Sequence, residues 1–206
     1  MTNVQRPQAL LFDFDGVLAD TEPLHCFCWQ EVLAEQGIPL DWEFYRKECV
    51  GLSEREFLSA IGRRASPVRT ADELWPLYPL KQKRFAEEAM RREVIPWATR
   101  SAVKSLQGMP LAVVTSSCRA EIEPILKKEG VFECLDVCVY GDEVERLKPA
   151  PDPYLLALER LGVNQGVVFE DSEAGMTSAR KAGCTVVQVR DPAELPELVK
   201  RVSNFR

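Results

Sequence analysis

The sequence contains no long run of hydrophobic residues. The first such run, residues 9–12, meets Asp13 at once. No run approaches the roughly 18 apolar residues of a membrane-spanning helix, and no secretory signal, with its apolar stretch of about 7–15 residues, is visible. We therefore expect a cytoplasmic protein with no membrane partner.

Histidine and regularly spaced cysteine are also scarce. His25 is the single histidine, and the seven cysteines include no CxxC pair. Zinc sites and disulfide frameworks depend on such regular groups. On a helix, Cys26 would point about 100° away from the face that His25 and Cys28 share. We expect free thiols, buried or half-buried.

The sequence has fewer positively charged than negatively charged residues. The 206 residues include 26 Lys and Arg against 32 Asp and Glu, which gives a net charge of −6. No basic stripe interleaved with aromatic residues appears, so a nucleic-acid partner is not expected. The pairs Arg63-Arg64 and Arg91-Arg92 are typical of solvated helix faces. No repeat or low-complexity linker is present, and the length suits one large domain or a core with a companion.

What is present falls into two patterns. Residues 9–15 are predicted to form a buried strand, and residues 22–90 a series of helices with no convincing strand between them. After Pro96, strands alternate with helices, which is typical of a parallel sheet covered on both faces. The predicted strands are 110–116, 135–141, 166–171 and 184–190. The predicted helices after Pro96 are 98–108, 119–130, 152–162 and 173–183.

This pattern predicts an α/β fold. Its core is a doubly wound, Rossmann-like parallel sheet built from residues 1–21 and 92–206, with an all-helical insert at 22–91. Local signals predict a capping box between Ser53 and Glu56. The prolines of segment 70–92 are expected to divide or bend its helix. In the helix at 152–162, we expect Asp152 as N-cap and Pro153 at the first helical position.

Polar side chains follow four of the predicted strands. They are Asp13 and Asp15, then Thr115, Ser116 and Ser117, then Lys148, and finally Glu170 and Asp171. Each group has an ordinary explanation by itself: a turn, a helix cap, a solvated lysine or a favourable charge at a helix start. Because open α/β sheets bind ligands at the carboxyl ends of their strands, the four groups together favour one site.

The chemistry of this set points to phosphate. Four carboxylates in one crevice raise one another's pKa unless a cation neutralises them. Oxygen ligands with spare water positions suit Mg²⁺, so Asp13, Asp15, Glu170 and Asp171 are the expected metal residues. Lys148 would neutralise phosphate oxygens and Thr115 would donate a hydrogen bond.

Four segments carry a family resemblance. DFDGVLADT (13–21), VVTSS (113–117), LKPAPDPY (147–154) and VVFEDSEAG (167–175) resemble, in order and spacing, the motifs of the haloacid dehalogenase-like hydrolase superfamily. The branch they most resemble contains phosphatases and β-phosphoglucomutase-like enzymes. The likeness extends from about residue 9 to residue 190, and within the family the insert at 22–91 resembles a helical cap domain over the substrate.

The resemblance implies a role for each core residue. Asp13 matches the nucleophile that forms an aspartyl-phosphate. Asp15 matches the general acid–base, and its backbone carbonyl a Mg²⁺ ligand. Asp171 matches the metal carboxylate, with Glu170 beside it. Thr115 matches the hydroxyl of the second motif, Lys148 the lysine that steadies nucleophile and phosphate, and the backbone at Ser116 an N–H donor to the substrate.

The resemblance also separates activities. Haloacid dehalogenases lack an aspartate at the position of Asp15 and phosphonatases replace it, so neither activity is expected. In the cap, His25 and Lys81 are candidate substrate-binding residues. Mutases of this family carry an arginine three residues after a cap glycine, whereas here Glu54 stands at that distance from Gly51, which favours a phosphatase.

We therefore expect an enzyme: a Mg²⁺-dependent phosphatase acting on a small phosphorylated metabolite of the sugar phosphate or phosphoglycolate type, and a monomer. A hexose-phosphate mutase of the β-phosphoglucomutase type is the alternative. A non-enzymatic, receiver-like phospho-aspartate module is a more distant one, since receivers are shorter and lack a helical insert. Hinges are expected near residues 20–22 and 93–97. The leaving group of the substrate is left open by the sequence.

Overall fold

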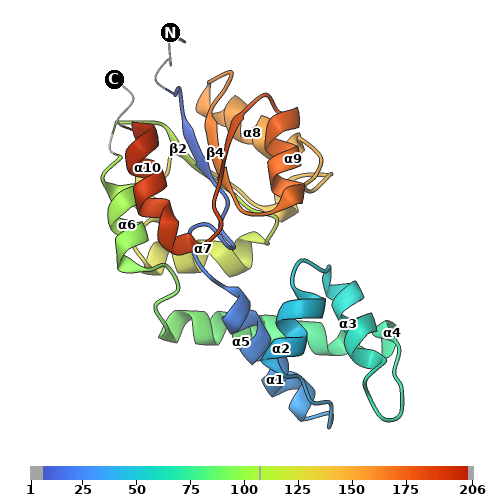
Figure 1. Ribbon diagram of the computed structural model, residues 1–206. Coiled ribbons are helices and arrows are strands. Elements are labelled where there is room, and N and C mark those ends of the chain that lie inside the picture. Colours follow the sequence, from blue (N-terminus) through green and yellow to red (C-terminus); the bar gives the residue numbers. More distant parts are fainter. Residues whose placement is uncertain (1–6, 107, 204–206) are drawn as a thin grey trace. The chain divides into compact units, whose positions relative to one another are not determined.

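The computed structural model describes residues 7–106 and 108–203. The chain divides into two compact units. The core consists of Met1–Asp20 with Glu93–Arg206, and the cap of Thr21–Arg92. Figure 1 shows both, and each is described by itself.

The described part of the core contains a five-stranded sheet of order β3-β2-β1-β4-β5. All neighbouring strands are parallel, which confirms the predicted α/β class. The strands are β1 (Leu10–Phe12), β2 (Leu111–Val114), β3 (Val137–Val139), β4 (Val167–Glu170) and β5 (Thr185–Gln188). The chain winds from β1 to β3 on one side and returns to β4 on the other. The strand order therefore reverses between β1 and β4, where such sheets bind ligands.

Helices cover both faces of this sheet. They are α6 (Trp97–Lys104), α7 (Arg119–Lys128), α8 (Asp152–Leu161), α9 (Glu173–Lys181) and α10 (Leu195–Ser203). Short 3₁₀ turns occur at Phe132–Cys134, Gly141–Glu143 and Pro192–Glu194. Helices α8 and α9 lie on one side of the sheet, and α6 packs against α10 on the other (Figure 1). Leu11, Val114 and Val168 form an apolar cluster with residues of α8 and α9.

Two details of the core differ from the sequence-based expectation. Helix α8 begins at Asp152 itself and Pro151 is its N-cap residue, so the predicted N-cap was wrong. The proline ring fixes φ near the helical value, and Pro151 already has φ −75° and ψ −9°, which starts the helix one residue early. Helix α10 was not predicted, although its buried Leu195, Val199 and Val202 have helical spacing.

The described part of the cap is helical throughout, as predicted. Its helices are α1 (Glu22–Ala34), α2 (Trp42–Phe44), α3 (Glu54–Gly62), α4 (Ala71–Leu74) and α5 (Tyr78–Arg91). A π-helical turn at Tyr45–Cys49 and a 3₁₀ turn at Trp75–Leu77 connect some of them. The 3₁₀ turn holds Pro76 and divides segment 70–92, as the prolines there predicted.

The capping box before α3 is confirmed by both of its reciprocal bonds. The Ser53 backbone N–H donates to the Glu56 carboxylate over 2.9 Å, and the Glu56 N–H donates to the Ser53 hydroxyl over 3.4 Å. Trp29, Phe57 and Ile61 belong to the apolar centre of the cap. All seven cysteines are free, which confirms the expected unpaired thiols.

Over residues 7–106 and 108–203, every helix is too short or too polar to serve as a membrane span.

Candidate active site

The loop after β1 places the first two aspartates. The Asp13 N–H donates to the Phe169 carbonyl of β4 over 3.0 Å, which extends the sheet hydrogen bonding to Asp13 and buries it. Gly16 follows with φ 75°, a conformation that residues with a side chain rarely adopt. A Cβ atom on Gly16 would lie 2.2 Å from the Asp171 Oδ2, so this turn also requires glycine for space.

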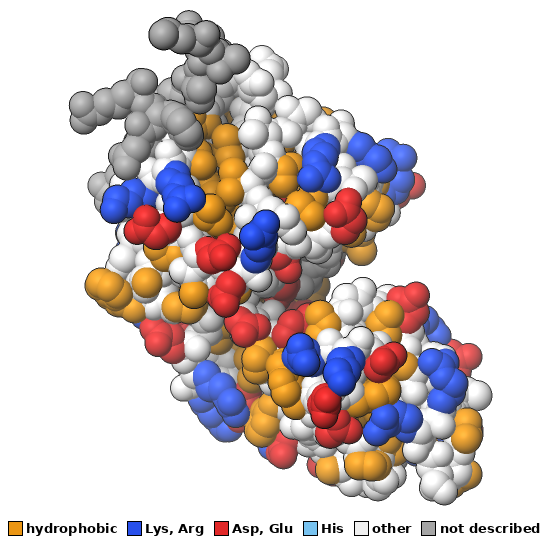
Figure 2. Space-filling model, in the orientation of Figure 1, with side chains coloured by type: hydrophobic (Ala, Val, Ile, Leu, Met, Phe, Trp, Pro, Cys, Tyr) orange, Lys and Arg blue, Asp and Glu red, His pale blue; other side chains and the backbone are white. Residues whose placement is uncertain are grey.

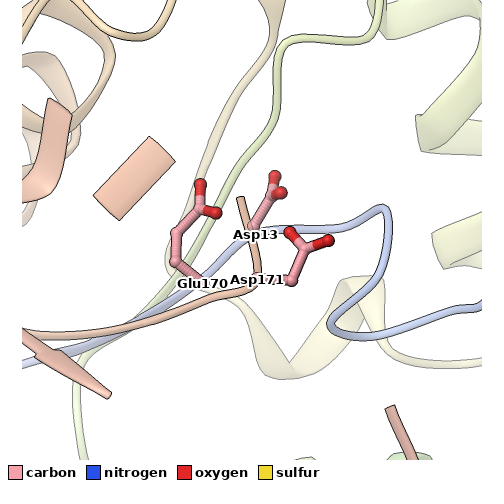
Figure 3. A group of neighbouring side chains, drawn as sticks. All are labelled: Asp13, Glu170 and Asp171. Carbon is pink, nitrogen blue, oxygen red and sulfur yellow. The ribbon is translucent and has the colours of Figure 1, made fainter. Parts of the chain in front are cut away.

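Three carboxylates converge at the switch point. Glu170 is the last residue of β4, and Asp171 follows it. Asp13, Glu170 and Asp171 each offer an oxygen, and these oxygens lie within 4.8 Å of one another. Figure 3 shows the three side chains directed toward a common space. Asp13 and Glu170 are buried, whereas Asp171 is exposed to solvent.

Lys148 supplies a positive charge to this cluster. Its Nζ lies 2.9 Å from the Asp13 Oδ1 and 2.6 Å from the Glu170 Oε1, and it also donates to the Val114 carbonyl over 2.9 Å. The loop after β3 thereby reaches the ends of three other strands. Within the described part of the chain, one ammonium group stands against three carboxylates, so the cluster keeps an excess of negative charge.

The pKa values reflect this excess. Burial raises the pKa of Asp13 to about 8; the Lys148 ammonium opposes this shift, while Glu170 and Asp15 add to it. Partial burial and the neighbouring Glu170 raise the pKa of Asp171 to about 6. Burial alone would lower the pKa of Lys148, but Asp13 and Glu170 outweigh it and the net shift is upward. A bound cation would lower both aspartate pKa values again.

The donor set fits Mg²⁺. The cluster offers only hard oxygen ligands, and its exposed side at Asp171 leaves room for water, which Mg²⁺ keeps in most protein sites. The side-chain carboxylate of Asp15 is not part of the three-residue cluster. Its Oδ2 accepts a hydrogen bond from the Ser117 hydroxyl over 2.9 Å.

The end of β2 contributes hydroxyl and amide groups. The Thr115 N–H donates to the Val139 carbonyl, and the Thr115 side chain is buried. The Thr115 Oγ1 accepts a hydrogen bond from the Ser117 N–H over 3.0 Å, which curls the backbone around the exposed Ser116. The structure thus gathers the sequence-predicted residues of the core at one edge of the sheet. They are Asp13, Asp15, Thr115, Ser116, Lys148, Glu170 and Asp171.

Sequence reasoning assigned no role to two residues of this edge. Ser117 contacts Asp15, and the Tyr154 hydroxyl donates to the Glu170 Oε1 over 3.0 Å. Both stand inside the quoted segments 113–117 and 147–154. Their residue types gave no signal, because a serine and a tyrosine at these places also suit a helix cap and an apolar core.

The two predicted cap residues each lie against other cap side chains. Lys81, in α5, is buried and its Nζ lies 2.9 Å from the Glu54 Oε1 in α3. The His25 ring stacks on Phe85 with centroids 4.3 Å apart. Burial, followed by the Lys81 ammonium, lowers the pKa of His25 well below its usual range, so this imidazole is neutral at pH 7.

Comparisons with known proteins give the family. A sequence profile described as haloacid dehalogenase-like hydrolase matches residues 10–189. Fructose-1-phosphate phosphatase YqaB of Escherichia coli is 36% identical over 190 residues, 90% of this chain and 98% of that protein. A phosphorylated carbohydrates phosphatase of Thermotoga maritima is 33% identical, over 85% of this chain and 82% of that protein.

A solved structure agrees with these relatives. CbbY from Rhodobacter sphaeroides, crystallised in complex with phosphate, superposes with a TM-score of 0.72 at 30% identity and covers 88% of this chain and 86% of that one. The matches include both the core and the cap, and they confirm the resemblance carried by the four motifs. The chain belongs to the haloacid dehalogenase-like hydrolase family.

Proposed function

We propose that this chain is a Mg²⁺-dependent phosphatase that hydrolyses a small phosphorylated metabolite, with sugar phosphates as the favoured class. The observation that carries the proposal is the position of Asp13 at the switch point of the sheet, where its carboxylate pairs with the Lys148 ammonium and lies within 4.8 Å of the Glu170 and Asp171 carboxylates. Two relatives that cover most of the chain are named as phosphatases of fructose 1-phosphate and of phosphorylated carbohydrates.

The first chemical step uses Asp13 as nucleophile. An oxygen of its carboxylate attacks phosphorus, and the bond between phosphorus and the leaving oxygen breaks. Asp15 donates its proton to that oxygen. The Ser117 hydroxyl, 2.9 Å from the Asp15 Oδ2, holds this carboxyl group in one orientation.

The second step releases phosphate. Asp15, now a carboxylate, accepts a proton from the water that attacks the phosphorus of the aspartyl-phosphate, and the bond to Asp13 breaks. Lys148, the Thr115 hydroxyl and the backbone N–H at Ser116 hold the phosphoryl oxygens. A Mg²⁺ ion held by Asp13, Glu170, Asp171 and the Asp15 carbonyl would neutralise charge on those oxygens.

The cap is proposed to select the substrate. His25 and Lys81 are its candidate binding residues. The position of Glu54 affects whether a second phosphate group of a substrate can bind at Lys81. The Lys81 charge is already matched by the Glu54 carboxylate, so a second phosphate at this lysine would meet a negative group. This arrangement supports hydrolysis of a monophosphate over the mutase alternative, which handles a bisphosphate.

Surface charge supports a small-molecule substrate. On the face drawn in Figure 2, Lys and Arg side chains lie among Asp and Glu side chains and form no single basic patch. Membership of a hydrolase family leaves the receiver-like alternative without support.

A metabolite screen tests the proposal. The purified chain is incubated with Mg²⁺ or with EDTA and with p-nitrophenyl phosphate, fructose 1-phosphate, glucose 6-phosphate and phosphoglycolate, and kcat/KM is determined for each. We expect phosphate release only with Mg²⁺, a sugar phosphate as the best substrate, and no release by Asp13→Asn. If wild type releases no phosphate, or Asp13→Asn releases as much, the proposal is wrong. Conversion of β-glucose 1-phosphate to glucose 6-phosphate, followed by NMR, would favour the mutase.

A further inference from the structure

Tyr154 joins the apolar core to the charged site. It lies in the first turn of α8 with 0% of its side chain exposed, and its ring belongs to the same apolar cluster as Leu11 and Val168. Its hydroxyl reaches a charged group and donates to the Glu170 Oε1 over 3.0 Å.

The carboxylate of Glu170 is held from both sides. Its Oε1 accepts from Tyr154 and from Lys148, and its Oε2 accepts from the Ser172 N–H and hydroxyl, both over 3.1 Å. The torsion that turns a carboxylate is broad and nearly two-fold, so hydrogen-bond donors decide the orientation of the Glu170 carboxylate. Donors on opposite oxygens fix the plane of the group.

Tyr154 also touches the lysine of the site. The Lys148 Nζ lies 5.0 Å from the centroid of the Tyr154 ring, within the range of a cation–π contact. Lys148 is shared between Asp13 and Glu170, at 2.9 and 2.6 Å. The hydroxyl and the ring of one residue therefore fix both partners of this ion pair from the buried side.

We infer that Tyr154 is a positioning residue: it orients the Glu170 carboxylate and Lys148 so that Glu170, Asp13 and Asp171 present their oxygens to one divalent cation. The inference rests on the proposed function for the identity of the ion as Mg²⁺. Groups that orient metal ligands in this way contribute about 10- to 100-fold to metal affinity.

The chain offers a matched control in Tyr140. This residue is also buried, its hydroxyl donates to a glutamate, Glu123, over 3.4 Å, and a cation, the Arg119 guanidinium, lies 4.5 Å from its ring centroid. Tyr140→Phe thus removes the same atom from the same kind of environment, away from the carboxylate cluster.

The experiment measures Mg²⁺ binding by isothermal titration calorimetry without substrate, for wild type, Tyr154→Phe and Tyr140→Phe. We expect the dissociation constant of Tyr154→Phe to rise about 10-fold or more, and that of Tyr140→Phe to stay within about twofold of wild type. Metal-free unfolding curves of both variants report any general loss of stability. An unchanged Mg²⁺ affinity in Tyr154→Phe would overturn this inference alone, whereas a wild type that binds no Mg²⁺ would overturn the proposed function with it.

A second measurement needs no Tyr154 variant. The chain has four tyrosines, so 3-fluorotyrosine labelling gives four ¹⁹F resonances, of which three are assigned by Tyr→Phe changes at positions 45, 78 and 140. We expect the remaining resonance, from Tyr154, to shift when Mg²⁺ is added, and that of Tyr140 to stay in place. A Tyr154 resonance whose chemical shift does not change on addition of Mg²⁺ would contradict the inference.

Discussion

The core and the cap each bury one lysine beside carboxylates, in different proportions. In the core, the Lys148 side chain is 5% exposed and bonds to two carboxylates, with Asp171 completing a group of three. In the cap, the Lys81 side chain is 2% exposed and pairs with one carboxylate of the described residues, that of Glu54. Three aromatic rings, of Trp29, Tyr78 and Phe85, surround the cap lysine at 5.5–6.0 Å from their centroids.

The difference separates a site that needs a further ion from one that does not. The core cluster has more negative than positive charge, which burial makes costly unless a cation joins it. The cap pair is balanced one to one, and the aromatic faces add favourable contacts to the ammonium. The core is therefore arranged for chemistry on a phosphoryl group, whereas the charges of the cap pair are balanced before any substrate binds.

The largest expected effect comes from a substitution in the carboxylate cluster of the core. Asp13→Asn removes the proposed nucleophile and keeps the shape of the side chain, so kcat for any phosphate ester should fall by about 10⁴-fold or more. The measurement is steady-state phosphate release with Mg²⁺. Asp72→Asn in the cap, whose carboxylate is exposed and pairs with Arg55, is the control and should keep wild-type activity. Comparable losses in both variants would contradict the assignment of Asp13.

The second prediction compares the same substitution, lysine to methionine, at the two buried lysines. Lys148→Met removes the ammonium that pairs with Asp13 and Glu170, and kcat for p-nitrophenyl phosphate should fall by about 10²–10³-fold. Lys81→Met should change kcat for this substrate by less than about threefold, because p-nitrophenol offers the cap no sugar hydroxyl, while it raises KM for the best sugar phosphate. Equal effects of the two changes on p-nitrophenyl phosphate would remove the distinction between core and cap.

The third prediction concerns pH and metal. The folded-state pKa values of Asp13 and Asp171 are raised above the ordinary 3.8, to about 8 and about 6, so the metal-free folded protein binds more protons than the unfolded chain between these limits. The stability that the protonated Asp13 and Asp171 contribute is therefore lost as pH rises from about 4 to 8. Mg²⁺ replaces those protons, and at about 100 times its Kd should add about 2.7 kcal/mol to the free energy of unfolding.

Thermal unfolding tests whether Mg²⁺ stabilises the protein more at a pH where Asp13 and Asp171 lose their protons. The Tm gain from Mg²⁺ should be larger at pH 8 than at pH 6, with NaCl of equal ionic strength as the control. A gain that shrinks between pH 6 and pH 8 would show that protons and the metal do not compete at these aspartates.

The smallest effect tests the balance of the cap pair. Glu54→Gln leaves the buried Lys81 ammonium without a charged partner, and should cost roughly 1–3 kcal/mol, since the 30% exposure of Glu54 discounts the loss expected for a fully buried pair. Lys81→Met fills the same space without charge and should cost less than about 1 kcal/mol. Urea unfolding measures both; a larger loss for Lys81→Met would mean that the aromatic contacts, rather than the ion pair, dominate.

Much of the core site could be predicted because parallel strands end at one edge. Asp13 follows a strand that is apolar on both faces, and Glu170 ends another, so their proximity follows from strand order alone. The Ser53 capping box was equally local, since its two partners are three residues apart.

Other contacts depend on packing that the sequence does not encode locally. Lys81 and Glu54 are 27 residues apart on two helices, and their pairing follows from how α3 and α5 pack. Ser117 rather than Ser116 reaches Asp15, because the Thr115 hydroxyl turns the backbone between them. The role inferred for Tyr154, in helix α8, needs the position of Glu170, which lies at the end of strand β4.

The absent side chain of Gly16 has a practical consequence. A single added methyl group would collide with Asp171 and would also strain the turn, yet it would change no ionisable group of the site. Gly16→Ala would therefore keep every reactive atom of the enzyme while the first and fourth motifs lose their fit. Such a variant offers a chemically complete but misaligned enzyme, against which the contribution of alignment alone can be measured.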